Sequence, residues 1–371
     1  MSLDFDKYEL SKFCTFSYGK MPEKDKVLDD TTKYPIFSGY QIVGYYDEYN
    51  IDKNELIVIA RGVGGTGDVK LTPARCYLTN LSIGFSIDQN YALTKFLYYY
   101  FQINHLGYLN SGSAQPQITI NDLKHVEVPL PPLNIQSKII DIIDTIDEKI
   151  KINKEINKNL SKVSNAIHFD FIKTISNNKE CSFIELKELG EIVMGQSPKG
   201  TSYNYDNVGL PLINGAADYE NGFLKAQKYT SEPKKTCNKN DLIFCIRATI
   251  GLLVICDKEY CLGRGVAAIT NINPQYKEYA FHLINSSIEN FKRAATGSVI
   301  SGISRKDIEN IIIKIPSDDE IKRYHNIQKP IFEKLENNRI EIEKLTKLRD
   351  TLLPKLMSGE IDVSKINCDL E

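Results

Sequence analysis

Two glycine-rich segments are the first places where this sequence could bind a phosphate or a nucleotide. The first, Gly62-Val63-Gly64-Gly65-Thr66-Gly67, follows a short apolar run and has the spacing of a dinucleotide-binding fingerprint. That fingerprint needs a helix next, because the helix N-terminus holds the pyrophosphate. Residues 68–73 favour a second strand instead, so we predict a strand–turn–strand. The second segment, Gly195-Gln196-Ser197-Pro198-Lys199-Gly200-Thr201, lacks the Gly-Lys-Ser/Thr ending of a phosphate-binding loop.

Residues suited to metal binding or nucleophilic catalysis are present but follow no recognisable pattern. The chain has 8 cysteines and 5 histidines. The absence of any Cys-x-x-Cys pair argues against a zinc site and against a disulfide framework, and fits a reducing cytoplasm. No Asp/Asn-Pro-Pro-aromatic segment suggests amino-methyltransferase chemistry, and no Ser/His/Asp or Cys/His arrangement can be argued from spacing. We therefore predict no catalytic residue, no metal and no cofactor for this chain.

The overall composition fits a globular protein without a strongly basic surface. The formal net charge is -2 and the pI is about 6.3, with 42% hydrophobic and 25% charged residues. Any surface that binds nucleic acid must therefore be local. No run approaches the roughly 18 apolar residues of a membrane span, and the N-terminus lacks a signal-peptide pattern. We expect a cytoplasmic protein without a membrane partner.

The elements that would position any site are written twice in this sequence. A set of landmark residues recurs in the same order in the second half, at offsets of about 176 to 186 positions. The increase in offset indicates about ten extra residues in the second copy, between Gly215 and Asp241. Ordered pairs at a nearly constant offset favour duplication over a chance alignment of turn glycines. The pairs are Leu10 and Leu186, Gly19 and Gly195, Pro35 and Pro211, Gly39 and Gly215, Leu56 and Leu242, Ile57 and Ile243, Arg61 and Arg247, Tyr91 and Tyr276, Ile118 and Ile303, Asp122 and Asp307, Pro131 and Pro316, and Leu160 and Leu345.

Each copy has the same predicted plan, in which a globular part of short strands and one helix is followed by a long helix. Glu55–Arg61 and Asp241–Arg247 are short apolar runs that predict buried strands. Tyr91–His105 and Tyr276–Ala294 have the apolar spacing of helices. We divide the chain into globular domains at 1–129 and 179–315, long helices at 130–178 and 316–360, and a tail at 361–371.

Both long helices carry an apolar stripe at spacings of three and four, which predicts a coiled-coil-like seam. Asn153 and Asn338 interrupt the stripes at matching places. Either both lie in the seam of an antiparallel pair, where a polar residue fixes register, or both lie just outside it and are solvated. We expect Pro330 to kink or restart the second helix and Pro354 to disturb its end. The stripes are Ile139, Ile143, Ile146, Ile150, Ile156, Leu160, Val163 and Ile167, and then Ile327, Ile331, Leu335, Ile342, Leu345, Leu352 and Leu356.

These features together predict an α+β fold with an internal pseudo-twofold repeat. Two globular domains, each of mixed short strands and a helix, are joined by two long antiparallel coiled-coil helices. Such an arrangement suits a split target, made of two short DNA sites at a fixed distance.

Several segments of this sequence resemble one protein family. Pro131-Pro132-Leu133-Asn134-Ile135-Gln136 at a helix start is similar to the Pro-Pro-Leu-x-x-Gln signature of the type I restriction–modification specificity subunits, and residues 348–361 are similar to their C-terminal hallmark. The paired Gly-x-x-Pro turns, the two arginine loops and residues 112–116 complete a match over nearly the whole chain. At the second helix start, Ser317-Asp318-Asp319-Glu320-Ile321 replaces the Pro-Leu and the Gln of the pattern.

The resemblance implies a non-catalytic DNA-recognition subunit. Each globular part would be a target-recognition domain that reads one half of a bipartite double-stranded DNA site. The helices would set the spacer and dock two modification subunits, which are adenine methyltransferases. A translocating restriction subunit would join to cut unmodified DNA, and S-adenosylmethionine and ATP would bind these partners. Two alternatives stay open: the recognition subunit of a methylation-only or other multisubunit system, and a two-lobed protein–protein scaffold.

Polar and basic residues of the duplicated loops are the candidates for DNA contacts, because side chains read base edges and cations hold phosphates. Arg61 and Arg247 lie at matching strand ends, where they would contact guanine or phosphate or else form surface salt bridges. Tyr98–Tyr100 is expected to pack the helix and not to stack on bases. The weaker candidates, each with a solvated turn as the alternative, are Lys20, Gln196, Ser38, Asn214, Gln115, Gln117, Ser298 and Ser301. The predicted positions in the helix seam are Ile146, Ile150, Asn153, Leu160, Leu335, Asn338 and Leu345.

Overall fold

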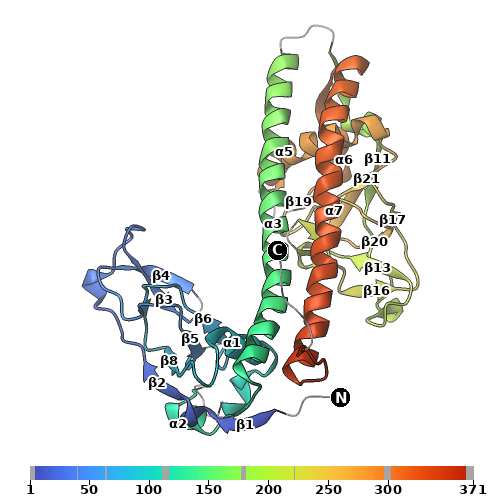
Figure 1. The fold of residues 1–371 in the computed structure, drawn as a ribbon. Coiled ribbons are helices and arrows are strands. Elements are labelled where there is room, and N and C mark those ends of the chain that lie inside the picture. The colour runs from blue at the N-terminus through green and yellow to red at the C-terminus, as the bar shows by residue number, and fades with distance from the viewer. Residues whose placement is uncertain are drawn as a thin grey trace. The chain divides into compact units, whose positions relative to one another are not determined.

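The structure is a computed structural model of the 371-residue chain, and it describes residues 5–39, 41–62, 65–110, 117–176, 181–220, 222–295 and 302–364. The chain divides into two compact units (Figure 1). Unit 1 consists of Met1–Lys154 and Ile340–Glu371, and unit 2 consists of Glu155–Arg339. Both long helices cross the boundary, so each unit contains a globular part and a portion of each helix.

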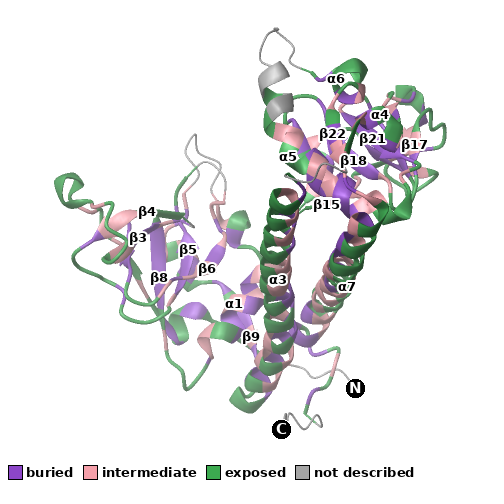
Figure 2. Ribbon diagram, turned by 90° about the horizontal axis from the view of Figure 1, so that it is seen from above, coloured by how far each residue is buried: buried purple, intermediate pink, exposed green. Residues whose placement is uncertain are grey.

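Unit 1 is built on a four-stranded antiparallel sheet with the strand order β2-β8-β5-β6. Alternate residues of a strand face the same side of the sheet. On one side Leu56, Val58 and Phe85 belong to the buried core, and β5 and β8 are coloured purple in Figure 2. Helix α1 closes this core with Leu97 and Phe101, as the predicted helix over 91–105 requires. The bounds are Cys14–Tyr18 for β2, Ser82–Ile87 for β8, Leu56–Ile59 for β5, Val69–Leu71 for β6 and Thr94–Ile103 for α1.

Two smaller sheets complete the globular part of unit 1. The first has the order β4-β3-β7, in which β3 pairs antiparallel with β4 and parallel with β7. The second pairs β1 with β9. Strand β5 precedes the glycine-rich segment, and β6 follows it and pairs antiparallel with β5, so a strand and not a helix comes next, as predicted. The remaining bounds are Asp6–Glu9 for β1, Leu10–Lys12 for η1, Lys24–Lys26 for η2, Tyr34–Ser38 for β3, Gln41–Tyr46 for β4, Tyr77–Leu78 for β7, Leu106–Leu109 for η3, Ile120–Lys124 for α2 and Glu127–Leu130 for β9.

Unit 2 repeats this topology. Its four-stranded sheet has the order β11-β21-β18-β19, and α5 packs on it as α1 does in unit 1. Strand β13 pairs antiparallel with β16 and parallel with β20, which matches β3 with β4 and β7. The bounds are Ser182–Glu185 for β10, Leu186–Leu189 for α4, Glu191–Met194 for β11, Gly200–Ser202 for η4, Tyr203–Asn204 for β12, Leu210–Ile213 for β13, Lys228–Thr230 for β16, Thr236–Cys237 for β17, Leu242–Cys245 for β18, Gly251–Ile255 for β19, Tyr260–Leu262 for β20, Val266–Thr270 for β21, Pro274–Tyr276 for η6, Lys277–Ala295 for α5, Arg305–Glu309 for α6 and Ile312–Ile315 for β22.

The predicted duplication is therefore confirmed at the level of single hydrogen bonds. Thr119 and Asp122 form a capping box at the start of α2, and Ser304 and Asp307 form the same box at the start of α6. The extra residues of the second copy contain the hairpin of β14 and β15. This hairpin lies between β13 and β16, within the interval that the sequence indicated. The bounds are Ala216–Asp218 for η5, Tyr219–Glu220 for β14 and Phe223–Leu224 for β15.

The long helices are α3, over Leu133–Ser176, and α7, over Asp318–Met357, and they run side by side in both units (Figure 1). The predicted restart at Pro330 is wrong, because α7 continues through this residue. A proline removes one helical hydrogen bond and crowds the preceding turn. After the proline, Phe332 of α7 packs edge-to-face on Phe281 of α5, and such contacts hold this part of the helix in place. Pro354 lies within the last turn before α7 ends at Met357.

The apolar stripe is misplaced at two positions. Val163 is 50% exposed and Ile327 is 53% exposed, although both were predicted to face the seam. Their places in the interior of unit 2 are taken by the neighbouring polar residues Ser164 and Gln328, at 2% and 0% exposure. In the part of the chain that the structure describes, no helix is long and apolar enough to cross a membrane.

Candidate functional site

The predicted polar candidates of unit 1 gather where several turns meet at one end of its sheets. We call this surface turn cluster 1 and define it as residues 19–22, 38–39, 60–62, 79–81 and 117–118. Backbone hydrogen bonds tie these segments together over distances of 2.8–3.2 Å, from Gly19 N to Ser82 O, Lys20 N to Leu78 O, Thr79 N to Phe37 O, Ala60 N to Leu81 O and Ile118 N to Ala60 O.

Turn cluster 2 is the corresponding surface of unit 2, made of residues 195–198, 214–215, 246–247, 263–265 and 302–303. The same bonds recur over 2.8–3.0 Å, from Gly195 N to Val266 O, Gln196 N to Leu262 O, Gly263 N to Ile213 O, Ile246 N to Gly265 O and Ile303 N to Ile246 O. Two sequences that share few side chains thus build one backbone framework.

The glycines of the two Gly-x-x-Pro turns are required by close backbone approach. A Cβ atom at Gly19 would lie 2.2 Å from the carbonyl oxygen of Thr79. At Gly195 it would lie 2.0 Å from the carbonyl oxygen of Gly263. Both distances are below van der Waals contact, and the obstacle is backbone that has no rotamer to change. The duplicated glycines therefore hold each turn against its neighbour.

The side chains of turn cluster 1 are mostly accessible. Lys20 and Arg61 are exposed, and the Arg61 guanidinium carbon lies 5.9 Å from the ring centroid of Tyr18. Ser38 is half-buried and accepts a hydrogen bond of 3.2 Å from the Thr79 hydroxyl. The backbone of Arg61 also forms a β-bridge with Gln117. Four predicted candidates, Lys20, Ser38, Arg61 and Gln117, thus lie in one cluster.

Turn cluster 2 contains the matching residues. Gln196, Asn214 and Arg247 are exposed, and the backbone of Arg247 forms a β-bridge with Gly302, as Arg61 does with Gln117. Asp218 accepts a hydrogen bond of 2.7 Å from Asn214 N, which fixes the chain after β13. Gln115, Ser298 and Ser301 were also predicted as candidates, and they lie outside the described residues.

The sequence reasoning missed Arg264, which lies in the middle of turn cluster 2. Its backbone N and its Nε both approach Ser197 Oγ, at 3.4 and 3.2 Å. In the sequence, the glycines on either side of Arg264 are the one local signal of a turn. In the structure, Leu78 and Leu262 occupy equivalent ladder positions, so Asn80 is the counterpart of Arg264 in unit 1. Within the described ranges, no carboxylate forms an ion pair with Arg61, Arg247 or Arg264. Local unpaired guanidinium groups can therefore bind base edges or phosphates despite the overall negative charge.

Gln136 explains the Pro-Pro-Leu-x-x-Gln segment. Its side chain is fully buried and accepts a hydrogen bond of 2.8 Å from Leu93 N. Its Nε2 donates to the carbonyls of Tyr91 and Pro131, each at 2.9 Å. One side chain thus joins the start of α3 to the start of α1. At the second helix start Ser317 and Glu320 form a local cap instead, through bonds of 3.0 and 2.9 Å to the Glu320 carboxylate.

Polar contacts between α3 and α7 define their antiparallel pairing in each unit. In unit 1, Arg349 pairs with Asp147 at 2.9 Å, and Asn153 Nδ2 donates to Glu341 Oε2 at 3.1 Å. In unit 2, Asn338 Nδ2 donates to Asn157 Oδ1 at 2.8 Å. Asn153 is 6% exposed and Asn338 is 0% exposed. No described group bonds the Oδ1 atom of Asn338.

The predicted apolar seam positions divide between the same two units. Ile146 and Ile150 are buried in unit 1. The half-buried members are Leu160, Leu335 and Leu345.

Unit 2 contains a buried polar cluster where α3, α5 and α7 meet. The rings of His168 and His282 stack with centroids 4.7 Å apart. Ser164 Oγ lies 2.9 Å from His282 Nε2 and donates to Gln328 Oε1 at 2.7 Å, while Tyr324 Oη lies 2.9 Å from His168 Nδ1. Burial lowers the pKa of His168 to about 4. Burial, and then the nearby His168, lower the pKa of His282 to about 3. Both imidazoles are neutral near pH 7.

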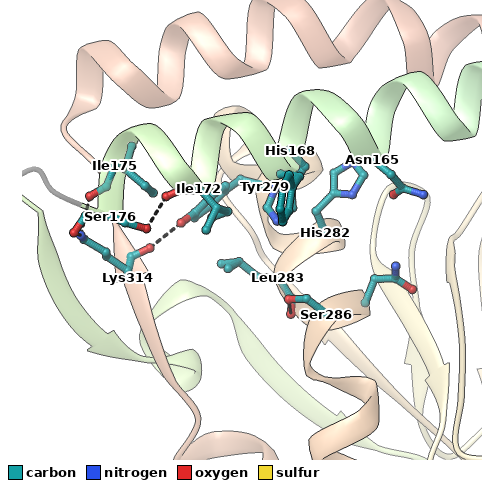
Figure 3. A pocket seen from close by; sticks show the side chains of 12 residues that line it. Asn165, His168, Ile172, Ile175, Ser176, Tyr279, His282, Leu283, Ser286 and Lys314 are labelled. Carbon is teal, nitrogen blue, oxygen red and sulfur yellow. Dashed lines mark hydrogen bonds between the residues drawn. The ribbon is translucent and has the colours of Figure 1, made fainter.

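A cavity of about 440 Å³ adjoins this cluster (Figure 3). The apolar part of its wall includes Ile172 and Leu283, and Lys314 lies at one end, where its ammonium donates to the carbonyls of Ile175 and Ser176. Among the residues that line the cavity, the hydroxyls of Ser176 and Ser286 donate to the carbonyls of Ile172 and Leu283. Across the described part of the chain, no group of three or more His, Cys, Asp and Glu residues is placed to hold a metal ion.

The tyrosine cluster Tyr98–Tyr100 packs α1, with Tyr99 donating to Asp144 at 2.5 Å, as expected for a structural role.

Comparison with known proteins gives a consistent picture. A family model described as the type I restriction modification DNA specificity domain matches residues 3–162 and again residues 178–350. A putative type I restriction enzyme MjaX specificity subunit from Methanocaldococcus jannaschii is 29% identical over 290 residues, 74% of this chain and 68% of that protein. The type I restriction enzyme HindI specificity subunit from Haemophilus influenzae is 23% identical over 330 residues, 66% of this chain and 71% of that protein. The crystal structure of an S subunit from M. genitalium covers 95% of this chain and 96% of its own, with a TM-score of 0.69 at 20% identity.

Proposed function

Because this chain belongs to the family of type I restriction–modification DNA specificity proteins, we propose that its two turn clusters read the two halves of a split DNA target. The chain is the non-catalytic specificity subunit of such a complex, and it selects the sequence on which partner subunits act. This role fits a chain whose two glycine-rich segments each lack part of a nucleotide-binding pattern.

The observation that carries the proposal is the repeated framework of the turn clusters. The same backbone bonds hold both clusters, while their side chains differ: Lys20 corresponds to Gln196 and Ser38 to Asn214. A rigid backbone with exchangeable polar side chains is what a pair of readers needs when the two half-sites differ in sequence. We assign DNA contacts to these residues and to Arg61, Arg247 and Gln117. The globular domains at 1–129 and 179–315 are the exchangeable readers in this proposal.

The long helices supply the spacer and the docking surface for modification subunits. Two methyltransferase subunits would bind, one for each copy of the repeat, and S-adenosylmethionine would bind to them. The two helix starts differ, since Gln136 joins α3 to α1, whereas Ser317 and Glu320 form a cap at the start of α7. The two docking surfaces are therefore similar and not identical. A restriction subunit that uses ATP would complete the complex.

The test is to map modified bases in the DNA of a host that lacks its own modification and expresses this chain with a methyltransferase subunit. The expected result is a single motif of two short specified segments separated by an unspecified spacer of fixed length. A motif with one continuous segment contradicts the two-reader assignment. Failure of the purified complex to bind any duplex identifies a scaffold instead. ATP-dependent cleavage, measured with a restriction subunit added, separates the full system from a methylation-only one.

A further inference from the structure

We propose that Arg264 is a specificity-determining residue that reads a guanine in the half-site recognised by unit 2, and that Asn80 holds the equivalent reading position in unit 1. The inference rests on the proposed function, which assigned DNA reading to the turn clusters but gave no role to these two residues. It follows from the position of Arg264, the rigidity of its turn, the state of its guanidinium and its comparison with Asn80.

The turn that contains Arg264 is the hub of turn cluster 2. Gly263 N bonds to the end of β13, Gly265 O accepts from the end of β18, and the flanking residues of the turn bond to the Gly195 turn. The segments that carry Gln196, Asn214 and Arg247 lie far apart in the sequence, and each is hydrogen-bonded to the turn that contains Arg264. Because these segments meet at one turn, we expect Arg264 to face the same half-site as the three residues.

The backbone of this turn cannot shift easily. A Cβ atom at Gly263 would lie 2.2 Å from Asn214 Oδ1, and one at Gly265 would lie 2.1 Å from Asn214 O. The turn is therefore packed directly on the chain after β13, whose course Asp218 fixes through its bond to Asn214 N. A fixed Cα position lowers the entropic cost of using a long side chain as a reader.

Ser197 orients the guanidinium of Arg264. Its hydroxyl oxygen lies 3.2 Å from Nε, which uses the inner donor of the group. The side chain is exposed, and no described acceptor bonds its two terminal nitrogens. These nitrogens form a planar fork that matches the O6 and N7 acceptors of guanine in the major groove. A fixed plane helps to match a flat base edge, whereas a phosphate accepts hydrogen bonds from many directions. The geometry therefore favours a base contact.

The repeat provides an internal comparison. Asn80 occupies the equivalent turn in unit 1, which the same backbone bonds hold through Thr79 N and Lys20 N. An asparagine amide matches the N6 and N7 groups of adenine, not the acceptor pair of guanine. The equivalent of Ser197 is Met21, which offers no hydroxyl to an arginine. The reading position is thus common to both units, and its side chain and orienting partner differ together.

The experiment compares modified-base motifs in genomic DNA from hosts that express a methyltransferase subunit with the wild-type chain, Arg264→Ala, Arg264→Lys or Arg305→Ala. Arg305 is an exposed arginine on α6 that pairs with Glu309, and it serves as the matched control. In Arg264→Ala we expect one guanine in one half of the motif to become unspecified, with discrimination at that base reduced about 5- to 150-fold. The other half, and the Arg305→Ala motif, should match the wild type.

Two results overturn the inference. One is an unchanged motif with methylation reduced equally at all sites in Arg264→Ala, which identifies a phosphate contact. The other is an unchanged motif at full methylation in Arg264→Ala, because no side chain then remains to contact the base. In Arg264→Lys, which retains the charge without the planar fork, reduced discrimination at one guanine supports the assignment. If Arg264→Ala gives no methylation, binding of the purified complex to duplexes with one substituted base pair at each position decides: a loss of discrimination at one guanine supports the assignment, and an equal loss at every position contradicts it. Failure of the proposed function is recognised separately, since the wild-type chain would then give no split motif.

Discussion

Acid should destabilise unit 2 through His168 and His282. Both side chains are neutral in the folded state, since burial lowers their pKa values to about 4 and about 3, while an unfolded histidine titrates near 6.5. The unfolded chain therefore binds protons more readily as the pH falls below about 6.5. The stabilisation from keeping these rings neutral is complete above that pH and is lost progressively down to about pH 4 and then about pH 3.

The size of the effect follows from the two pKa values. At about pH 5 the folded rings remain almost wholly neutral, so the loss is set by protonation of the unfolded chain, about 2 kcal/mol for each ring. The pair should therefore lose about 4 kcal/mol between about pH 7.5 and about pH 5. The groups that face the rings, Tyr279 and Tyr324, have pKa values raised by burial and remain protonated over this range.

The assay is hydrogen exchange of the α5 peptide together with urea unfolding followed by circular dichroism, at both pH values. The test variant is the double substitution His168→Leu and His282→Leu, because Leu353 and Leu97 fill the equivalent places in the core of unit 1. Other titrating groups affect both proteins equally, so the difference between them isolates the two rings. Equal losses in the wild type and the double variant would refute this reasoning. His105→Gln, at an exposed histidine, should behave as the wild type.

Three further substitutions test the framework. Gly195→Ala should destabilise turn cluster 2 by about 1–3 kcal/mol, because its Cβ would meet the Gly263 carbonyl at 2.0 Å. This variant should also weaken reading of one half-site only. The control Gly200→Ala, where the added Cβ has open space, should leave the melting temperature and the motif unchanged. Gln136→Leu should lower the unfolding free energy of unit 1 by several kcal/mol, at about 1–3 kcal/mol for each buried group left unpaired, and a urea midpoint equal to the wild type would contradict the capping role. Asn338→Leu removes a buried oxygen that no described group bonds, so a urea titration should show unit 2 more stable by about 1 kcal/mol, and a loss of stability would show that the bond to Asn157 dominates.

The fold was largely predictable because the duplication is visible in the sequence. Strands with buried apolar runs, such as those at Leu56 and Leu242, and helices with regular apolar spacing are local signals that survive in both copies. The seam in unit 2 was less predictable. There the interior positions hold Ser164 and Gln328, so the apolar pattern predicted their exposed neighbours, Val163 and Ile327, as interior residues instead. Only a tertiary partner, such as His282 for Ser164, makes such residues suitable for burial.

The candidate site was predictable in part for the same reason. Lys20, Ser38, Arg61 and Gln117 come from separate segments, and their convergence depends on ladder pairings that no local pattern specifies. The repeat showed which positions correspond between copies, but not which positions meet within one copy. Arg264 was missed because a single arginine between two glycines has no distinctive spacing, and its bond to Ser197 spans distant parts of the chain.

The most direct test of the two-reader account is exchange of one recognition domain. Residues 1–129 are replaced by the corresponding segment of a relative with a different motif, and modified bases are mapped in the DNA of the same host. The account predicts that one half of the motif changes while the other half stays as in the wild type, because unit 2 retains turn cluster 2 intact. A change in both halves would contradict independent reading by the two turn clusters.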